Sequence, residues 1–86
     1  MTDTKILVID NDPAICELIK SHFESEGYEV KTVSDGSESI STFKLYEPDI
    51  VLLDIMLPRK DGWQVCREIR EQSAKPVIML SAKGET

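Results

Sequence analysis

The chain has 86 residues, of which 41% are apolar, and its formal net charge is -6 at pH 7, which together predict one small acidic globular domain. The composition excludes a membrane-spanning protein, because no apolar run approaches the ~20 residues that cross a bilayer, and it disfavours nucleic-acid binding, which needs a basic face. Two separated cysteines and an N-terminus without a secretory signal indicate a cytoplasmic protein with free thiols and no membrane contact.

The first half of the chain alternates between short apolar runs and amphipathic segments. Residues 5–9 form a β-branched apolar run typical of a buried parallel strand. A helix is predicted from Pro13, capped by one of the two residues before it, to Gly27. Residues 28–33 alternate as an edge strand does, and a weaker helix then ends before Pro48. The predicted apolar face of the first helix consists of Ile15, Leu18, Ile19, His22 and Phe23.

The second half repeats this alternation. Residues 50–53 are the most continuously apolar run, which predicts a strand in the middle of the sheet. An amphipathic helix is predicted over residues 63–70, and residues 77–80 form a last, wholly apolar strand. The order is βαβαβαβ, and the connections are long enough for right-handed crossovers, so we expect an α/β fold with a parallel sheet.

Polar side chains follow three of the four predicted strands. Asp10, Asn11 and Asp12 come after the first strand, Asp54 ends the third, and Ser81 follows the last. The carboxyl ends of parallel strands meet at one edge of the sheet, where open α/β folds bind their ligands. We therefore expect these side chains to converge.

Carboxylates gathered at one edge need a proton or a cation, because two unit charges about 4 Å apart repel by ~4 kcal/mol at an effective dielectric near 20. Mg²⁺ suits the site better than Ca²⁺, because the carboxylates are few and room remains for water and a phosphoryl group. In such a site Asp54 can act as a nucleophile toward phosphorus, and Ser81 can donate its hydroxyl to a phosphoryl oxygen.

Three segments, residues 5–13, 48–62 and 76–83, resemble the receiver domain of two-component response regulators in motif and order. The resemblance covers the whole chain and implies a flavodoxin-like doubly wound parallel sheet with strand order 2-1-3-4. The sequences of residues 56–58 and 63–66 are similar to the corresponding sequences of regulators that carry a winged-helix DNA-binding domain.

The resemblance also implies roles for single residues. Asp54 matches the aspartate that accepts a phosphoryl group from the phosphohistidine of a sensor histidine kinase. Asp10 and Asn11 fall on the acidic pair that helps to hold Mg²⁺, and the backbone carbonyl of Met56 falls on a further ligand position. Ser81 matches the hydroxyl residue that moves toward the phosphoryl group on activation. The function implied is a phosphoacceptor switch with a transcriptional output, not a turnover enzyme.

Two departures from the family pattern qualify this expectation. Asn11 stands where the family normally has a second carboxylate, which predicts weaker Mg²⁺ binding. The final helix, strand and helix of the family, with the lysine that pairs with the phosphoryl group, have no counterpart in residues 1–86. We therefore expect a partial receiver domain that self-associates through its last strand or folds poorly, with DNA contacted only through an output domain outside this chain.

Three alternatives remain open from the sequence alone. A degenerate receiver would act as an interaction module without phosphorylation, because Asn11 replaces a carboxylate. A Mg²⁺-dependent phosphatase with an aspartyl-phosphate intermediate would commonly need an acid two residues after the nucleophile, where this chain has Met56. For Asp12, capping of the first helix and a water-mediated contact to the metal are both compatible with the pattern.

Overall fold

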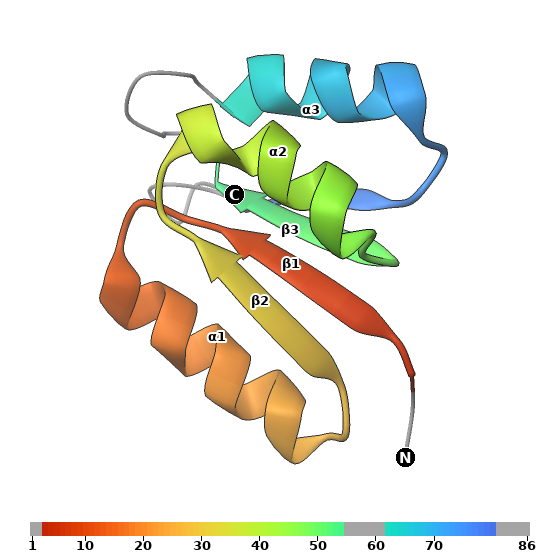
Figure 1. Cartoon of the computed structure of the whole chain (residues 1–86). Helices are drawn as coiled ribbons and strands as arrows, with labels where there is room; N and C mark the ends of the chain where they lie inside the picture. The colour runs from red at the N-terminus through yellow and green to blue at the C-terminus, as the bar shows by residue number, and fades with distance from the viewer. Residues whose placement is uncertain (1–2, 55–61, 81–86) are drawn as a thin grey trace.

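The computed structural model describes residues 3–54 and 62–80. Strands and helices alternate along the chain in the predicted βαβαβαβ order (Figure 1). The elements are β1 (Lys5–Ile9), α1 (Pro13–Ser25), β2 (Glu29–Val33), α2 (Gly36–Tyr46), β3 (Ile50–Asp54), α3 (Gly62–Gln72) and β4 (Val77–Leu80).

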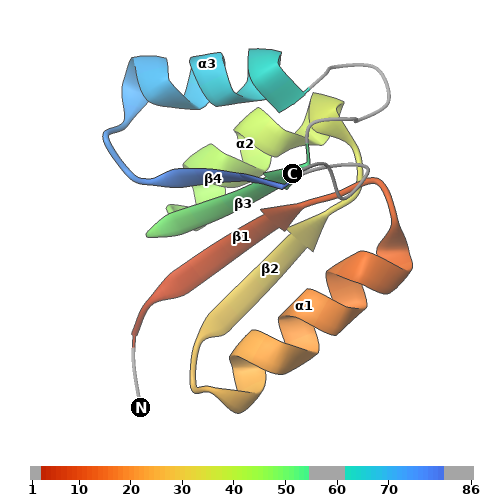
Figure 2. The ribbon, with the colours of Figure 1, turned by 180° about the vertical axis from the view of Figure 1, so that it is seen from behind.

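The four strands form one parallel sheet in the order β2-β1-β3-β4, which confirms the predicted topology (Figure 2). From β1 the chain moves outward to β2, and it then crosses back to β3 on the other side of β1. The strand order therefore reverses between β1 and β3, and their carboxyl ends mark the point where doubly wound folds bind ligands.

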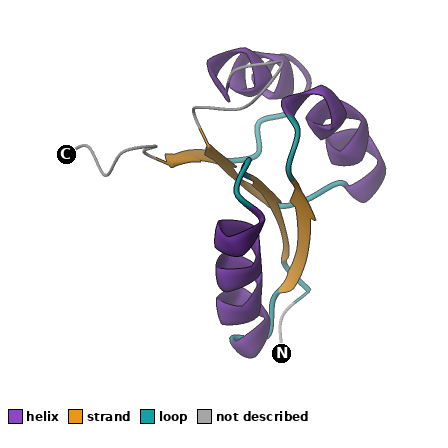
Figure 3. Ribbon diagram, turned by 90° about the vertical axis from the view of Figure 1, so that its left-hand side faces the viewer, coloured by secondary structure: helices purple, strands orange, loops and turns teal. Residues whose placement is uncertain are grey.

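The helices cover both faces of the sheet. Figure 3 shows α1 on one face and α2 with α3 on the other. Buried parallel strands need this cover, because their side chains are apolar on both faces. The inner strands β1 and β3 are accordingly the most buried, whereas β2 at the edge alternates between exposed and buried positions as predicted.

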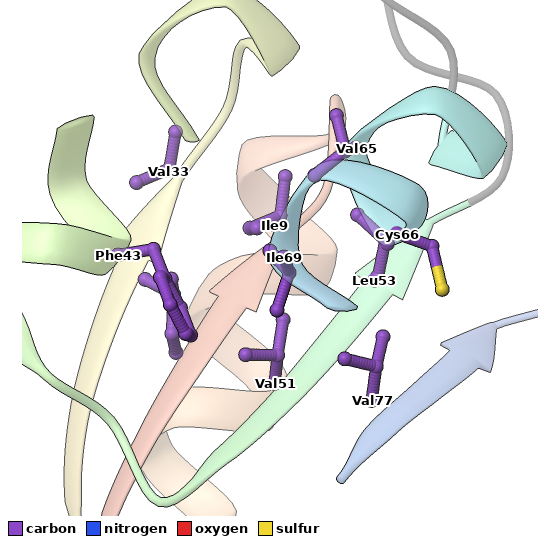
Figure 4. Packing of buried hydrophobic residues seen from close by; sticks show 10 residues of the cluster. Ile9, Val33, Phe43, Val51, Leu53, Val65, Cys66, Ile69 and Val77 are labelled. Carbon is purple, nitrogen blue, oxygen red and sulfur yellow. The ribbon is translucent and has the colours of Figure 1, made fainter. Parts of the chain in front are cut away.

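The larger hydrophobic core lies between the sheet and helices α2 and α3 (Figure 4). Alternate residues of β1 and β3 point into it, and α3 contributes residues that recur at helical spacing. The buried side chains of this core are Leu7, Ile9, Val33, Phe43, Val51, Leu53, Val65, Cys66, Ile69 and Val77.

The smaller core lies beneath α1, and here one prediction was wrong in part. Ile19 and Phe23 pack against this core as expected, but Ile15 and Leu18 are 38% and 68% exposed, and His22 is also exposed. Helix α1 packs mainly against β2 and β1, so only a narrow stripe of it meets the sheet. The stripe runs through Cys16, Ile19 and Phe23, at positions i, i+3 and i+7.

Aspartates cap the two helices α1 and α2 at their N-termini. The Asp12 carboxylate accepts a hydrogen bond from the Ala14 amide at 2.9 Å, and Pro13 is the first helical residue, as predicted. Asp35 caps α2 by accepting from the Ser37 amide at 2.8 Å. Beyond α1, Gly27 has φ 97°, a left-handed conformation that glycine adopts without steric cost.

Replacing the cap of α2 should lower stability measurably, because α2 is rich in serine and only weakly amphipathic. We expect Asp35→Ala to reduce the free energy of unfolding by about 1 kcal/mol, since the Ser37 amide loses its acceptor. Asp35→Asn retains an acceptor oxygen and should change stability by only a few tenths of this amount. Urea denaturation followed by circular dichroism measures both variants, and equal losses would contradict the capping role.

Candidate functional site

Two buried aspartates lie next to each other where the strand order reverses. Strands β1 and β3 pair in parallel, and their register ends with Ile9 opposite Leu53, so the next residues, Asp10 and Asp54, are neighbours at the carboxyl edge. Asp10 is 7% exposed and Asp54 is 9% exposed. Among the residues that the structure describes, these are the two buried charged side chains. The predicted convergence of Asp10 and Asp54 therefore occurs.

The Asp10 residue is fixed from several directions. Its Oδ1 accepts a hydrogen bond from the Asp12 amide at 2.8 Å, and its own amide donates to the Val33 carbonyl at 3.0 Å. The buried Cys16 thiol donates to the Asp10 carbonyl at 3.3 Å. These contacts hold the Asp10 carboxylate at the sheet edge before any ligand binds.

Sequence reasoning did not find the Cys16 and Asp12 contacts to Asp10. The Cys16 contact follows from the stripe of α1 that faces the sheet, and the periodicity of the sequence predicts this stripe only in part, because it leaves out Cys16. The Asp12 contact uses a backbone amide in the turn between β1 and α1. Almost every residue type has such an amide, so the amino-acid sequence does not reveal this contact. The short Asp-Asn-Asp turn before Pro13 was the available hint.

The surroundings of Asp10 disfavour its charged form. Burial raises the pKa of the Asp10 carboxyl most, and repulsion from Asp54 and Asp12 and a side-chain hydrogen bond with Asp54 raise it further. The hydrogen bond from the Asp12 amide acts in the opposite direction and lowers the Asp10 pKa. A cation beside Asp10 and Asp54 would relieve this repulsion, which is the electrostatic basis of a metal site here.

Removing the Asp10 charge should stabilise the metal-free fold. Since the folded-state pKa of Asp10 is raised, its contribution to stability is present at low pH and is lost as the pH rises through that pKa. We expect Asp10→Asn, which keeps an acceptor for the Asp12 amide, to raise the free energy of unfolding by roughly 1 kcal/mol at pH 7 in EDTA. The gain should vanish below about pH 4. Urea unfolding at both pH values tests this, and a variant less stable than wild type at pH 7 would contradict it.

The neighbouring polar residues have different roles in the structure. Asn11 and Asp12 are both exposed. The Asp12 carboxylate caps α1 through the Ala14 amide, which confirms the capping interpretation, whereas its water-mediated contact to a metal stays a prediction. Met56 and Ser81 lie outside the described residues.

The oxygen donors at the carboxyl ends of β1 and β3 fit a hard divalent cation. Asp10 and Asp54 supply carboxylates, and Asn11, next to Asp10, has a side-chain carbonyl. Within residues 3–54 and 62–80, no group of three His, Cys, Asp or Glu side chains is arranged to hold a metal ion. Side-chain amide and backbone carbonyls are further oxygen donors that suit Mg²⁺.

The sequence of residues 6–86 matches the family model described as the response regulator receiver domain. The chain belongs to the response regulator receiver domain family. The motifs around Asp10 and Asp54 predicted this family, and the parallel sheet with order 2-1-3-4 is its flavodoxin-like fold. It is a receiver of the two-component signalling type.

Two curated relatives of this receiver are probable transcriptional regulators. The receiver is 43% identical over 81 residues to the probable transcriptional regulator ycf27 of Cyanophora paradoxa. The aligned region covers 94% of this chain and 34% of that protein. The ycf27 protein of Guillardia theta is 43% identical over 84 residues, covering 98% of the chain and 33% of that protein. The receiver thus spans about a third of the length of these relatives.

Solved structures of receivers share the fold closely. The BeF3-activated N-terminal receiver domain of Klebsiella pneumoniae RstA matches with a TM-score of 0.91 and 33% identity, covering 95% of this chain and 70% of that one. The response regulator TrrA of Thermotoga maritima, in complex with Mg(2+)-BeF, matches with a TM-score of 0.87 and 38% identity, covering 94% of this chain and 71% of that one. In the part of this receiver that the structure describes, no helix has the length and apolar content needed to cross a membrane.

Proposed function

We propose that this receiver is a cytoplasmic phosphoacceptor switch in which Asp54 accepts a phosphoryl group from the phosphohistidine of a sensor histidine kinase. The observation that carries the proposal is the buried pair of Asp10 and Asp54 at the switch point of a receiver fold. Two carboxylates that are buried side by side destabilise a protein unless a proton or a bound cation neutralises them.

The chemistry is a transfer between two side chains. An oxygen of the Asp54 carboxylate forms a bond to phosphorus, the bond from phosphorus to the histidine nitrogen breaks, and that nitrogen keeps the electron pair. When bound, Mg²⁺ supplies charge neutralisation for the carboxylates and the phosphoryl oxygens. Asp10, oriented by the Asp12 amide, supplies one fixed anionic ligand, and we assign further ligand positions to Asn11, Asp54 and the Met56 carbonyl.

The proposed switch also uses Ser81, whose hydroxyl donates to a phosphoryl oxygen and so couples phosphorylation to a change in the fold. The receiver itself does not turn over substrate, and its output is transcriptional, through a DNA-binding domain of a longer regulator. The similarity to two ycf27 transcriptional regulators supports this output. The acidic net charge of -6 makes direct DNA contact by this domain unfavourable.

Beryllofluoride, which mimics an acyl phosphate, tests the proposal without a kinase. Trp63 is a suitable reporter, because it lies in the first turn of α3 and is 54% exposed. We expect beryllofluoride with Mg²⁺ to change Trp63 fluorescence in wild type and to have no effect on Asp54→Asn. An unchanged wild-type spectrum would favour the rival function, an interaction module that is never phosphorylated.

The asparagine at position 11 sets the expected strength of metal binding. Asn11→Asp adds one negative charge beside Asp10, and a unit charge about 4 Å from a cation contributes ~1 kcal/mol per unit of cation charge even in water. We therefore expect Mg²⁺ affinity to rise roughly tenfold or more. Isothermal titration calorimetry measures it, with Asn11→Gln as the uncharged control. Equal affinities of wild type and Asn11→Asp would exclude Asn11 from the ligand set.

A further inference from the structure

Cys16 contacts both ends of the turn that joins β1 to α1 (Figure 2). Its thiol donates a hydrogen bond to the backbone carbonyl of Asp10 at 3.3 Å. Its amide donates to the backbone carbonyl of Asp12 at 3.0 Å. Asn11 lies between these two carbonyls in the chain. One residue of the helix therefore holds the backbone of the turn on both sides of Asn11.

The two contacts differ in whether they need a cysteine. The contact to the Asp12 carbonyl is a helical hydrogen bond between residues four apart, which every residue type except proline can make. The Asp10 carbonyl lies six residues before Cys16, so a side chain with a donor must reach it. The thiol is that donor, because a carbonyl oxygen only accepts. The Asp10 contact therefore depends on the side chain at position 16.

The surroundings of Cys16 keep its side chain in place. Cys16 is 5% exposed and packs in the smaller core. The buried strand residues of that core are Ile6, Val8, Val30 and Leu52. They come from β1, β2 and β3. A thiol is a weak donor, but close packing fixes the direction in which it points. Cys16 thus connects the packed sheet to the turn.

From these contacts we propose that Cys16 is a positioning residue of the metal site, which holds residues 10–12 in the conformation in which Asp10 and Asn11 bind Mg²⁺. The inference rests on the proposed function, in which both residues are ligands. The Asp10 carboxylate accepts from the Asp12 amide at 2.8 Å, so a movement of the turn backbone also moves the carboxylate. Ligands that are held in place before the metal binds lose less conformational entropy on binding.

Asn11 makes this positioning more important in this receiver. Its side-chain carbonyl is a neutral ligand, so the carboxylates of the proposed ligand set are those of Asp10 and Asp54. Where ligand charge contributes less, ligand geometry contributes a larger share of the affinity. Partners that orient metal ligands commonly change metal affinity roughly 10- to 100-fold. Because Cys16 is a weak donor and acts through a backbone carbonyl, we expect an effect of about tenfold.

Isothermal titration of Mg²⁺ into Cys16→Ala and Cys16→Ser separates the hydrogen bond from the packing. Alanine removes the donor, whereas serine keeps a donor on a side chain of similar size. We expect Cys16→Ala to bind Mg²⁺ about tenfold more weakly than wild type, and Cys16→Ser to stay within about twofold of it. Equal affinities of Cys16→Ala and wild type would overturn the proposal. Equal losses in the two variants would also overturn it, because packing would then explain the effect.

The matched control is Cys66→Ala. Cys66 is also buried, at 9% exposed, but it packs in the larger core. We expect Cys66→Ala to lose stability in urea without losing Mg²⁺ affinity. Cys16→Val covers the case in which Cys16→Ala fails to fold, because valine has no donor and leaves no cavity. It should bind Mg²⁺ as weakly as we expect of Cys16→Ala, and wild-type affinity in a folded Cys16→Val would overturn the proposal.

A measurement without metal separates this inference from the proposed function. In EDTA, hydrogen exchange of the Asp12 amide, followed by NMR, reports its bond to the Asp10 carboxylate. We expect this amide to exchange several-fold faster in Cys16→Ala than in wild type, and at the wild-type rate in Cys16→Ser and Cys66→Ala. Wild type that binds no Mg²⁺ would overturn the proposed function and the metal role of Cys16 together. Wild type that binds Mg²⁺, with equal Asp12 exchange in all four proteins, would overturn the positioning role alone.

Discussion

Asp54→Asn is expected to abolish phosphorylation by acetyl phosphate, with no mass increase after incubation in Mg²⁺. Asparagine occupies nearly the same volume, so the fold is retained, but a neutral amide is a poor nucleophile toward phosphorus and removes one charge from the metal site. Asp54 also contributes to the raised pKa of Asp10. The variant should therefore be at least as stable as wild type while losing the reaction entirely.

The matched control for this experiment is Asp35→Asn. Asp35 also follows a strand, β2, at the same edge of the sheet, but its carboxylate caps α2 through Ser37. Asparagine is an equally good N-cap, so we expect Asp35→Asn to fold and to accept a phosphoryl group as wild type does. Intact-mass spectrometry distinguishes the variants directly. Phosphorylation of Asp54→Asn at the wild-type level would show that another residue is the acceptor.

Leu7→Ala is expected to lower stability more than the loss of a helix cap or of any exposed side chain. Leu7 is fully buried in β1 within the larger core, and leucine-to-alanine changes at such positions cost roughly 2–5 kcal/mol through lost burial and a residual cavity. A chain of 86 residues has a total stability on the order of 4–13 kcal/mol. The substitution therefore removes a large share of it.

The same substitution at an exposed leucine provides the control. Leu45 is 87% exposed on α2, and we expect Leu45→Ala to change the free energy of unfolding by less than about 0.5 kcal/mol. Urea denaturation followed by circular dichroism compares the two variants. Similar midpoints for Leu7→Ala and Leu45→Ala would mean that the sheet does not pack against α2 and α3 as described.

Most of the fold could be predicted because its signals are local. The apolar runs of β1 and β3 are continuous, as strands buried on both faces require, and Pro13 and Gly27 mark the ends of α1 in the sequence. The face of α1 could not be predicted as reliably. The exposed Leu18 has the same helical spacing as the buried residues of α1. Which of these apolar residues face the sheet depends on how α1 lies over β2 and β1, and the sequence pattern does not show this.

The candidate site, like the fold, could be predicted from the sequence only in part. Topology alone brings Asp10 and Asp54 together, because a parallel sheet aligns the ends of β1 and β3. The contacts that orient Asp10 come from the Asp12 amide and the Cys16 thiol, and neither follows from residue type or spacing. The roles assigned to Met56 and Ser81 rest on family resemblance and stay predictions, since both lie outside the described residues.

The most direct test of Asp54 as the phosphoacceptor locates the phosphoryl group in the wild-type chain. After reaction with acetyl phosphate and Mg²⁺, trypsin releases residues 45–59 as one peptide, which holds both Asp49 and Asp54. Fragmentation of that peptide separates the two carboxylates, and Asp49, which pairs with Lys75 at 3.3 Å, serves as the internal control. We expect a single phosphoryl group, on Asp54. A phosphoryl group on Asp49 or elsewhere, or none in a folded chain with Mg²⁺ bound, would contradict the proposed switch.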